Sequence, residues 1–485
     1  MKKLLLVLAF APAFLWAQSK KQRKAIAEQQ KADQVIISNL KNHVQFLSDD
    51  KLEGRSTGSK GETLAMEYVS NQFKSIGLQP KGTNGYIQEF LIEEGKQIEP
   101  STYLNIDGTK LELKKDYVPL AYSATKLVSG MPAMALRERG VPWFVDVKDW
   151  LDANTGNPGN NINSTIQKEA VRAAAKGATA LFVYNSTNRQ DNILFDNKDK
   201  TPSSPIPVIY IMPDGYKKFF SDHSQVLDIE LNVAFREGTR KGHNVIGYVD
   251  NGASSAIVIG AHYDHLGMGE DANALDTGKA IHRGADDNAS GTALLIELAR
   301  MLSASKAKNN NYLFIAFSGK ELGLLGSKYW LEHPTINAPV NYMVNLDMVG
   351  RYDTDKKLLI GGNGSSPIWP QVIAGIGDKT LQVKFDSTIT GPGDHESFYR
   401  KNIPVLFFNT GTHADYHKAT DNANKINYEG ELRIARYITR LVEATDNKGR
   451  IAFAKTQETV TAPVENTVKP GVTPYNSSNS AGLKN

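Results

Sequence analysis

Residues 256–302 read AIVIGAHYDHLGMGEDANALDTGKAIHRGADDNASGTALLIELARML: an apolar run, a polar loop and a second apolar stretch. The first run, Ala256 to Ala261, predicts a strand covered on both faces, because both alternating sets of its side chains are apolar. From Ala293 to Leu302 the apolar residues return at helical spacing, so that Leu294 and Leu298 share one face. This stretch therefore predicts a strand, a loop and an amphipathic helix.

The same pattern recurs towards the carboxyl end of the chain. Apolar runs that predict buried strands lie at Tyr312 to Phe317, Tyr342 to Leu346 and Val405 to Phe408. Strands that alternate with helices are typical of a layered α/β fold. We therefore expect residues 241–447 to form an α/β domain in which helices flank the sheet.

The pattern of apolar and loop-forming residues is different upstream of this domain. Residues 60–76 carry apolar side chains at helical spacing and are followed by Gly77, a stop signal, so we assign 18–94 to the first part of the same domain. Between 95 and 240, short apolar runs alternate with loops rich in Asn, Gly, Pro and Asp, which predicts an inserted β-rich module. Residues 448–485 lack periodicity, which predicts a disordered tail.

The amino end resembles a secretory signal peptide. Met1, Lys2 and Lys3 precede an apolar run from Leu4 to Ala17, and we assign residues 1–17 to the signal. The alternative is an uncleaved anchor, but this run is shorter than the ~20 residues that span a bilayer. We expect export to the periplasm or out of the cell, with no stable membrane anchor.

The amino-acid composition limits the kinds of catalytic group, metal ligand and partner that the chain can use. The chain of 485 residues has no cysteine, which excludes disulfides, a thiol nucleophile and thiolate metal ligands, so any metal must bind to His, Asp and Glu. The net charge of +4 falls to +2 when Lys2 and Lys3 leave with the signal. This small charge does not favour a nucleic-acid partner.

Ionisable side chains follow all four predicted strands. In open α/β sheets, ligands bind outside the carboxyl ends of the strands, so these side chains should converge. Imidazole and carboxylate ligands without thiolates favour catalytic zinc. The set suffices for two zinc ions that share a bridging carboxylate and together activate a water. Its members are His262 and Asp264, Lys320 and Glu321, Asp347, and residues 413–421, with 285–291 before the predicted helix.

Taken singly, these residues have simpler interpretations. Asp287 and Ser290 could cap the helix that follows, and Glu321 could complement a helix dipole. Their shared placement at strand ends favours one common site.

Several motifs in this region resemble those of the M28 metallopeptidases. They cover roughly residues 240–445, and their fixed order makes the resemblance specific. The segment LSDDKLEGRSTGSKGE from Leu47 resembles the family's amino-terminal part, and 95–240 resembles its protease-associated insertion. The motifs are GAHYDHLG from Gly260, GADDNASG from Gly284, FSGKELGLLGS from Phe317, NLDMVGR from Asn345, GDHESFYRKNIPVLFF from Gly393 and DYHKATDNANKI from Asp415.

The resemblance implies a mixed sheet flanked by helices and a role for each residue. Asp287 would bridge two zinc ions, because the family's ligand lies three residues before the Ser of the SG pair. His262 and Asp347 would complete opposite ions, and Glu321 and His417 would fill the remaining positions. Two further carboxylates, Asp264 and Asp421, would orient the imidazoles of His262 and His417.

One position departs from the family pattern. Active members carry a Glu directly before the zinc-binding Glu, where it acts as general base, whereas this chain has Lys320. A lysine with its usual pKa near ~10.4 cannot accept a proton at neutral pH, although two nearby dications would lower that value. Three interpretations of the catalytic base follow: Lys320 is neutral and acts as the base, Glu396 or Asp286 replaces it, or the site binds zinc with little turnover. A fourth interpretation is that the Lys320 side chain points to solvent beside the site.

The resemblance implies an exported two-zinc exopeptidase that removes amino-terminal residues from peptide substrates. A first alternative is a catalytically weak or inactive, receptor-like protein on the same scaffold, which Lys320 motivates. A second is a transferase of the glutaminyl cyclase type, but such members generally lack an insertion like 95–240.

Overall fold

The computed structural model describes residues 20–153, 162–269, 271–276, 278–353, 357–377, 381–388, 391 and 393–456. The predicted signal peptide and the predicted tail from residue 457 onward lie outside the described residues. The chain divides into two compact units, one formed by Met1–Phe90 with Lys241–Asn485 and the other by Leu91–Arg240. In the described part of the chain, no helix combines the length and the apolar character needed to cross a membrane.

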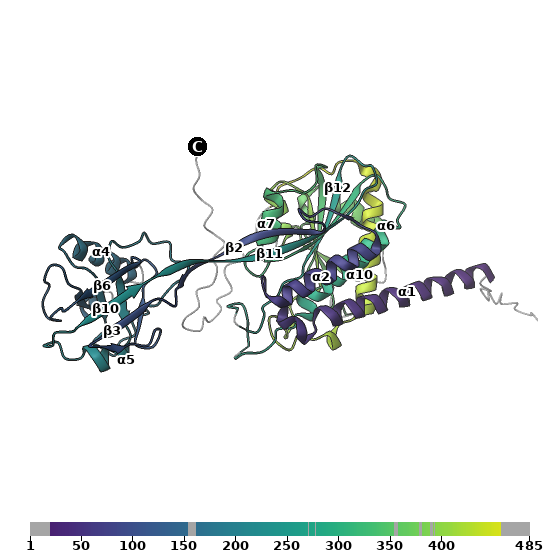
Figure 1. Ribbon diagram of the computed structural model, residues 1–485. Coiled ribbons are helices and arrows are strands. Elements are labelled where there is room, and N and C mark those ends of the chain that lie inside the picture. Colours follow the sequence, from purple (N-terminus) through teal and green to yellow (C-terminus); the bar gives the residue numbers. More distant parts are fainter. Residues whose placement is uncertain are drawn as a thin grey trace, which may run out of the picture. The chain divides into compact units, whose positions relative to one another are not determined.

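The first unit is built on a mixed sheet, which confirms the predicted fold class (Figure 1). The path through the described strands is β1-β11-β13-β12-β14-β17-β15-β16, and β2 pairs with β11. The four strands predicted from apolar runs are β12, β13, β14 and β17, and they are mutually parallel neighbours. The strands are β1 (Gln79–Pro80), β2 (Ile87–Ile98), β11 (Phe235–Val249), β12 (Ala256–His262), β13 (Asn311–Phe317), β14 (Val340–Leu346), β15 (Leu358–Gly361), β16 (Val383–Phe385) and β17 (Val405–Asn409).

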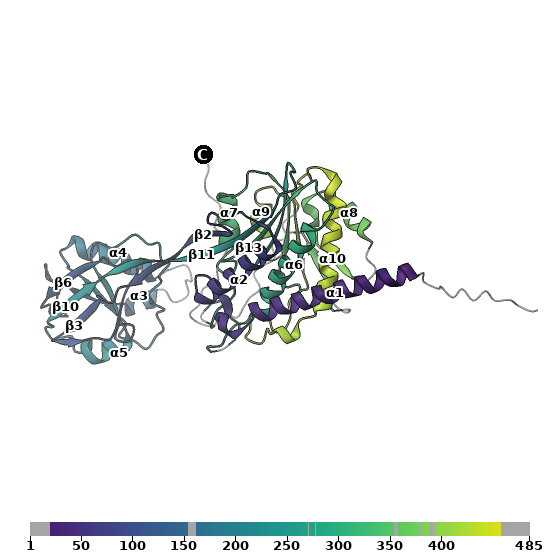
Figure 2. The same cartoon turned by 45° about the vertical axis from the view of Figure 1, so that its right-hand side comes forward.

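Helices cover both faces of this sheet, which explains why its central strands are apolar throughout. Ile257 and Ile259 of β12 pack into a core with α1, α2, α6, α8 and α10, whereas Val258 packs on the other face with Trp330 of α7 and Phe398 of α9. Figure 2 shows these helices around the sheet. These helices are α1 (Lys20–Leu47), α2 (Lys60–Ile76), α6 (Gly291–Ser303), α7 (Leu325–Glu332), α8 (Trp369–Ile376), α9 (His395–Tyr399) and α10 (Tyr428–Thr445).

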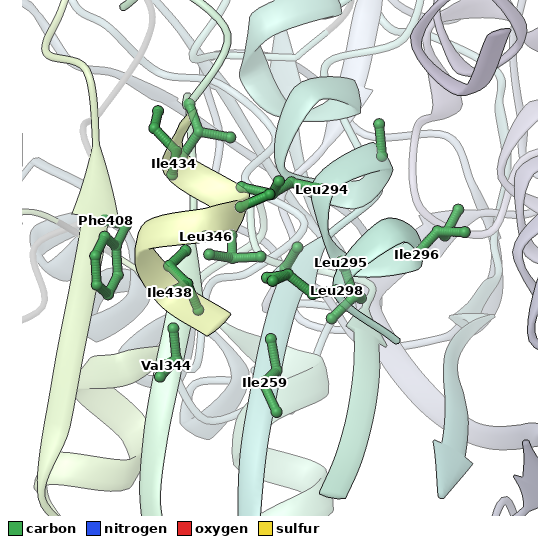
Figure 3. Close-up of a cluster of buried hydrophobic side chains, with 14 of the residues drawn as sticks. Ile259, Leu294, Leu295, Ile296, Leu298, Val344, Leu346, Phe408, Ile434 and Ile438 are labelled. Atoms are coloured by element: carbon green, nitrogen blue, oxygen red, sulfur yellow. The ribbon is translucent and has the colours of Figure 1, made fainter. Parts of the chain in front are cut away.

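Helix α6 packs its apolar side chains against the strands that carry the predicted site. Leu294 and Leu298 lie beside Leu346 of β14 and Ile438 of α10, as Figure 3 shows. All of these side chains are buried. The loop before α6 is therefore held firmly above the carboxyl ends of the strands.

The second unit contains two four-stranded sheets, ordered β4-β3-β10-β6 and β5-β9-β8-β7. It also contains helices, and α4 buries Ile166, Ala170 and Ala173 against the second sheet. The elements are β3 (Tyr103–Ile106), β4 (Thr109–Lys110), β5 (Tyr117–Pro119), β6 (Lys126–Gly130), β7 (Trp143–Asp146), α3 (Lys148–Ala153), α4 (Ile162–Ala175), β8 (Leu181–Tyr184), β9 (Val208–Ile211), α5 (Pro213–Gly215) and β10 (Ile229–Val233).

Candidate metal centre

Five side chains singled out from the sequence meet beyond the carboxyl ends of the central strands. His262 ends β12, Asp347 follows β14, and Glu321 follows β13 by four residues. Asp287 lies in η3 (Ala285–Ser290), an irregular helical turn directly before α6, and His417 lies in the segment after β17. Because the strands are parallel, their carboxyl ends share one edge, and the fold brings these distant residues together.

The distances sort the five side chains into two groups around Asp287. His262 Nε2 lies 3.3 Å from Asp287 Oδ1 and 3.4 Å from Asp347 Oδ1. His417 Nε2 lies 3.2 Å from Asp287 Oδ2 and 3.8 Å from Glu321 Oε2. Asp287 thus directs one oxygen to each imidazole, as a bridging ligand must.

This grouping differs in one respect from the roles that the resemblance implies. His262 and Asp347 were expected on opposite ions, but their ligand atoms are 3.4 Å apart on the same side of Asp287. The reason is the register of the sheet: β12 and β14 are direct parallel neighbours, so their ends deliver adjacent side chains. Glu321 and His417 form the other side.

The chemistry of these residues fits a metal. The three ligand atoms offered by His262, Asp287 and Glu321 lie within 4.8 Å of one another. Both carboxylate oxygens of Asp287 and the Nε2 of His417 are buried without a hydrogen-bond partner. The separations between Asp287 and the two imidazoles, 3.3 Å to His262 Nε2 and 3.2 Å to His417 Nε2, are close to the ~3.4 Å between two ligand atoms of a tetrahedral zinc ion with bonds of ~2.0–2.1 Å.

Asp264 supports the site through the backbone around it. Its carboxylate accepts hydrogen bonds from the N–H groups of Lys320 and Glu321, both at 3.2 Å, and from Thr57 Oγ1 at 3.0 Å. The same carboxylate lies 3.6 Å from His262 Nδ1, beyond hydrogen-bond distance, and the imidazole instead contacts the Asp264 carbonyl at 3.1 Å. Asp264 therefore orients two segments of the site at once.

Asp421 has a different partner from the one expected. Its carboxylate accepts from the N–H groups of Asp286 at 2.8 Å and Asp287 at 3.1 Å, while His417 Nδ1 contacts the Asn273 carbonyl at 3.0 Å. Residues four apart share a face only in a helix, and His417 has a φ of 56°, which breaks that geometry. Asp421 thus positions Asp287 rather than the imidazole of His417.

Asp286 and Glu396, the two carboxylates considered as replacement bases, already have other partners. Asp286 accepts from the Gly350 N–H at 2.7 Å and lies 3.1 Å from His413 Nε2. Glu396 pairs with Arg400, whose Nε lies 3.0 Å from its Oε1. These contacts favour structural roles for both.

Lys320 points into the ligand cluster, not to solvent. Its side chain is only 6% exposed, and its Nζ donates to Glu321 Oε1 at 3.1 Å. Burial alone would lower the pKa of Lys320, but Asp287, Asp347 and Glu321 outweigh it and raise that pKa well above its ordinary value. Without a metal ion, these carboxylates favour the ammonium form of Lys320, which cannot accept a proton.

Three residues around the site were missed in the sequence. His265 is buried with its Nδ1 3.7 Å from Glu321 Oε1, and Tyr416 stacks on His417 with ring centroids 3.8 Å apart. Arg55 donates to the carbonyls of Tyr263 at 2.8 Å and Gly284 at 3.0 Å. Each lies inside a quoted motif, but only the folded chain reveals which way it points.

Comparison with known proteins identifies the domain that carries this site. The sequence profile of peptidase family M28 matches residues 244–442, which contain all five candidate ligands. The chain carries an M28 peptidase domain.

The sequences similar to this chain include proteins named as aminopeptidases. Aminopeptidase YwaD of Bacillus subtilis is 27% identical over 57% of this chain and 59% of its own length. This chain thus spans about three fifths of that relative. The probable leucine aminopeptidase 2 of Aspergillus oryzae is 25% identical over 80% of this chain and 83% of its own. Among solved structures, an aminopeptidase from Aneurinibacillus sp. strain AM-1 is 24% identical, with a TM-score of 0.46, and the match covers 88% of this chain and 96% of that one.

Proposed function

We propose that this protein is an exported zinc exopeptidase that removes residues from the amino ends of peptides. The observation that carries the proposal is the convergence of two imidazoles and three carboxylates in the M28 domain, with Asp287 directing one oxygen to each imidazole. The names of the related aminopeptidases support the amino-terminal direction.

Zinc suits this set of donors because two imidazoles and carboxylates without thiolates are typical of catalytic zinc sites. When bound, zinc supplies Lewis-acid chemistry that polarises a carbonyl and activates a water. His262, Asp287, Glu321, Asp347 and His417 would hold it. The resemblance predicts two ions, and that number stays a prediction.

Export is proposed from the sequence of residues 1–17, whose charged start and short apolar run are typical of a secretory signal. We further propose that residues 95–240, which fall within the unit Leu91–Arg240, form the protease-associated module of the family. Peptides that reach the protein after export would be its substrates.

Lys320 favours a second candidate function. An ammonium at the position of the general base donates hydrogen bonds but accepts no proton, and general acid–base catalysis is typically worth ~10² to 10⁴-fold in rate. A zinc-binding, receptor-like protein with slow turnover is therefore the alternative. Binding of peptides without cleavage would be its signature.

Mass spectrometry of peptide mixtures incubated with zinc-loaded protein tests the proposal. We expect stepwise loss of residues from peptides with a free amino end, and none from the same peptides after acetylation. Glu321→Ala should abolish cleavage, whereas Glu332→Ala, a change of an exposed carboxylate at the end of α7, should leave it intact. Cleavage in the Glu321→Ala protein, or internal cleavage of acetylated peptides, would contradict the proposal.

A further inference from the structure

The Lys320 ammonium lies within 4 Å of all three carboxylates among the candidate metal ligands. Its Nζ is 3.1 Å from Glu321 Oε1, 3.7 Å from Asp287 Oδ1 and 3.7 Å from Asp347 Oδ2. The backbone N–H of Lys320 donates to Asp264, so the start of this side chain is fixed. A cation attached to the chain therefore sits where the family pattern expects a carboxylate.

The ammonium and His417 face different oxygens of the shared carboxylates. The shortest contact of the ammonium is Glu321 Oε1 at 3.1 Å, and it also lies 3.7 Å from Asp287 Oδ1, the oxygen directed to His262, and from Asp347 Oδ2. The oxygens directed to His417 are the other ones, Asp287 Oδ2 at 3.2 Å and Glu321 Oε2 at 3.8 Å. The Nε2 of His417 is buried without a hydrogen-bond partner.

We propose that the Lys320 ammonium takes the place of one cation, so that the centre holds a single zinc ion tightly, on the side formed by His417, Asp287 and Glu321. This inference rests on the proposed function for the identity of the ligands, and it revises the predicted number of two ions. Asp347 then faces the ammonium, and His262 has no tightly held second ion to bind.

The charges of the groups in direct contact support this arrangement. The three carboxylate ligands, the Lys320 ammonium and one zinc dication sum to zero. A second dication would give this set a net charge of +2 among side chains that are at most 9% exposed. Uncompensated charge in a buried site is strongly unfavourable, so the second ion should bind weakly or displace the lysine.

The decisive experiment measures zinc content per chain after equilibrium dialysis at buffered free zinc, read by mass spectrometry of the metal. The wild type should hold one zinc, Lys320→Met should hold two, and Lys320→Arg, which keeps the cation, should hold one. Circular dichroism checks the fold of each variant, and Lys320→Gln serves if Lys320→Met does not fold. Two tightly held ions in the wild type, or one in both neutral variants, would overturn the inference.

Two ligand variants locate the tightly held ion. His417→Ala should lower the zinc content from one to none, whereas His262→Ala should still hold one, and the reverse result would overturn the placement.

Failure of the inference differs from failure of the proposed function. Two zinc ions with peptide cleavage overturn only the inference, one zinc without cleavage overturns only the function, and no zinc overturns both.

Discussion

Lys320 and Glu321 are neighbours in sequence, and their side chains turn into the same buried cluster, where Lys320 Nζ donates to Glu321 Oε1 at 3.1 Å. The other oxygen of Glu321 faces His417. One side chain thus pairs with an internal cation while it offers its second oxygen as a metal ligand. Because the same Lys320 side chain pairs with a metal ligand and occupies the position of the general base, it affects both how many zinc ions bind and how a proton is transferred.

Lys320→Glu should increase turnover of aminoacyl p-nitroanilides. A carboxylate here can accept a proton that the ammonium cannot, and such catalysis is worth ~10² to 10⁴-fold. Lys320→Met is the matched control, because it removes the cation without supplying a base and should show no such gain in kcat. Equal turnover by the glutamate and methionine variants would show that position 320 does not limit proton transfer.

Asp421→Ala should weaken zinc binding about 10- to 100-fold, as is typical when a group that supports a ligand is removed. The reason is that Asp421 accepts from the N–H of Asp287, a candidate zinc ligand, at 3.1 Å. Titration against a zinc-chelating dye measures the affinity. Asp415→Ala is the control, since Asp415 contacts the same Arg351 at 3.2 Å but pairs otherwise with Lys425 and Thr420. Equal losses in both variants would contradict the role of Asp421.

Arg55→Lys should lower the free energy of unfolding by about 2–6 kcal/mol, because a buried carbonyl that loses its donor costs about 1–3 kcal/mol and lysine cannot reach several at once. Arg55 is buried and donates to four backbone carbonyls, those of Leu47, Tyr263, Arg283 and Gly284. Urea unfolding measures the change. Arg300→Lys, at a half-exposed pair with Glu297, should cost less than about 1 kcal/mol.

Asp394 and His395 should give opposite pH dependences of stability in metal-free protein. Burial raises the pKa of Asp394 to about 6, so its contribution is present at low pH and is lost as pH rises from about 4 to 6. Burial lowers the pKa of His395 to about 3, so its contribution is present above about pH 6.5 and is lost as pH falls. Between pH 4 and 6 the two slopes oppose each other.

Denaturant unfolding of single variants at several pH values measures the pH dependence of the free energy of unfolding that each residue contributes. Relative to wild type, Asp394→Asn should lose stability as pH falls from 6 to 4, and His395→Phe, which keeps the stacking on Phe407, should lose it as pH rises, each by at most about 1.4 kcal/mol per pH unit. Slopes of the same sign in both variants would rule out this assignment.

The sequence predicted the central strands well because burial on both faces leaves an unmistakable apolar run. Tyr312 to Phe317 and Val405 to Phe408 each fall within one residue of β13 and β17. The candidate ligands could be chosen because strand ends and motif spacing are local properties. Amphipathic α10, by contrast, was not singled out, although its periodicity was available in the sequence.

The features of the site that could not be predicted from the sequence depend on the direction in which side chains point in the folded chain. Whether Lys320 faces solvent or the cluster depends on the loop after β13, which Asp264 holds from another strand end. The partner of Asp421 depends on the non-helical φ of 56° at His417. The grouping of His262 with Asp347 depends on which strands are neighbours. These are tertiary properties that spacing along one chain does not encode.

Removal and return of zinc tests the central claim most directly. Protein stripped with a chelator should lose hydrolysis of an aminoacyl p-nitroanilide, and added zinc should restore it in the wild type but not in Glu321→Ala. Hydrolysis that persists at full rate without zinc, or a zinc-loaded wild type that cleaves no aminoacyl substrate, would contradict the account of this protein as a zinc aminopeptidase.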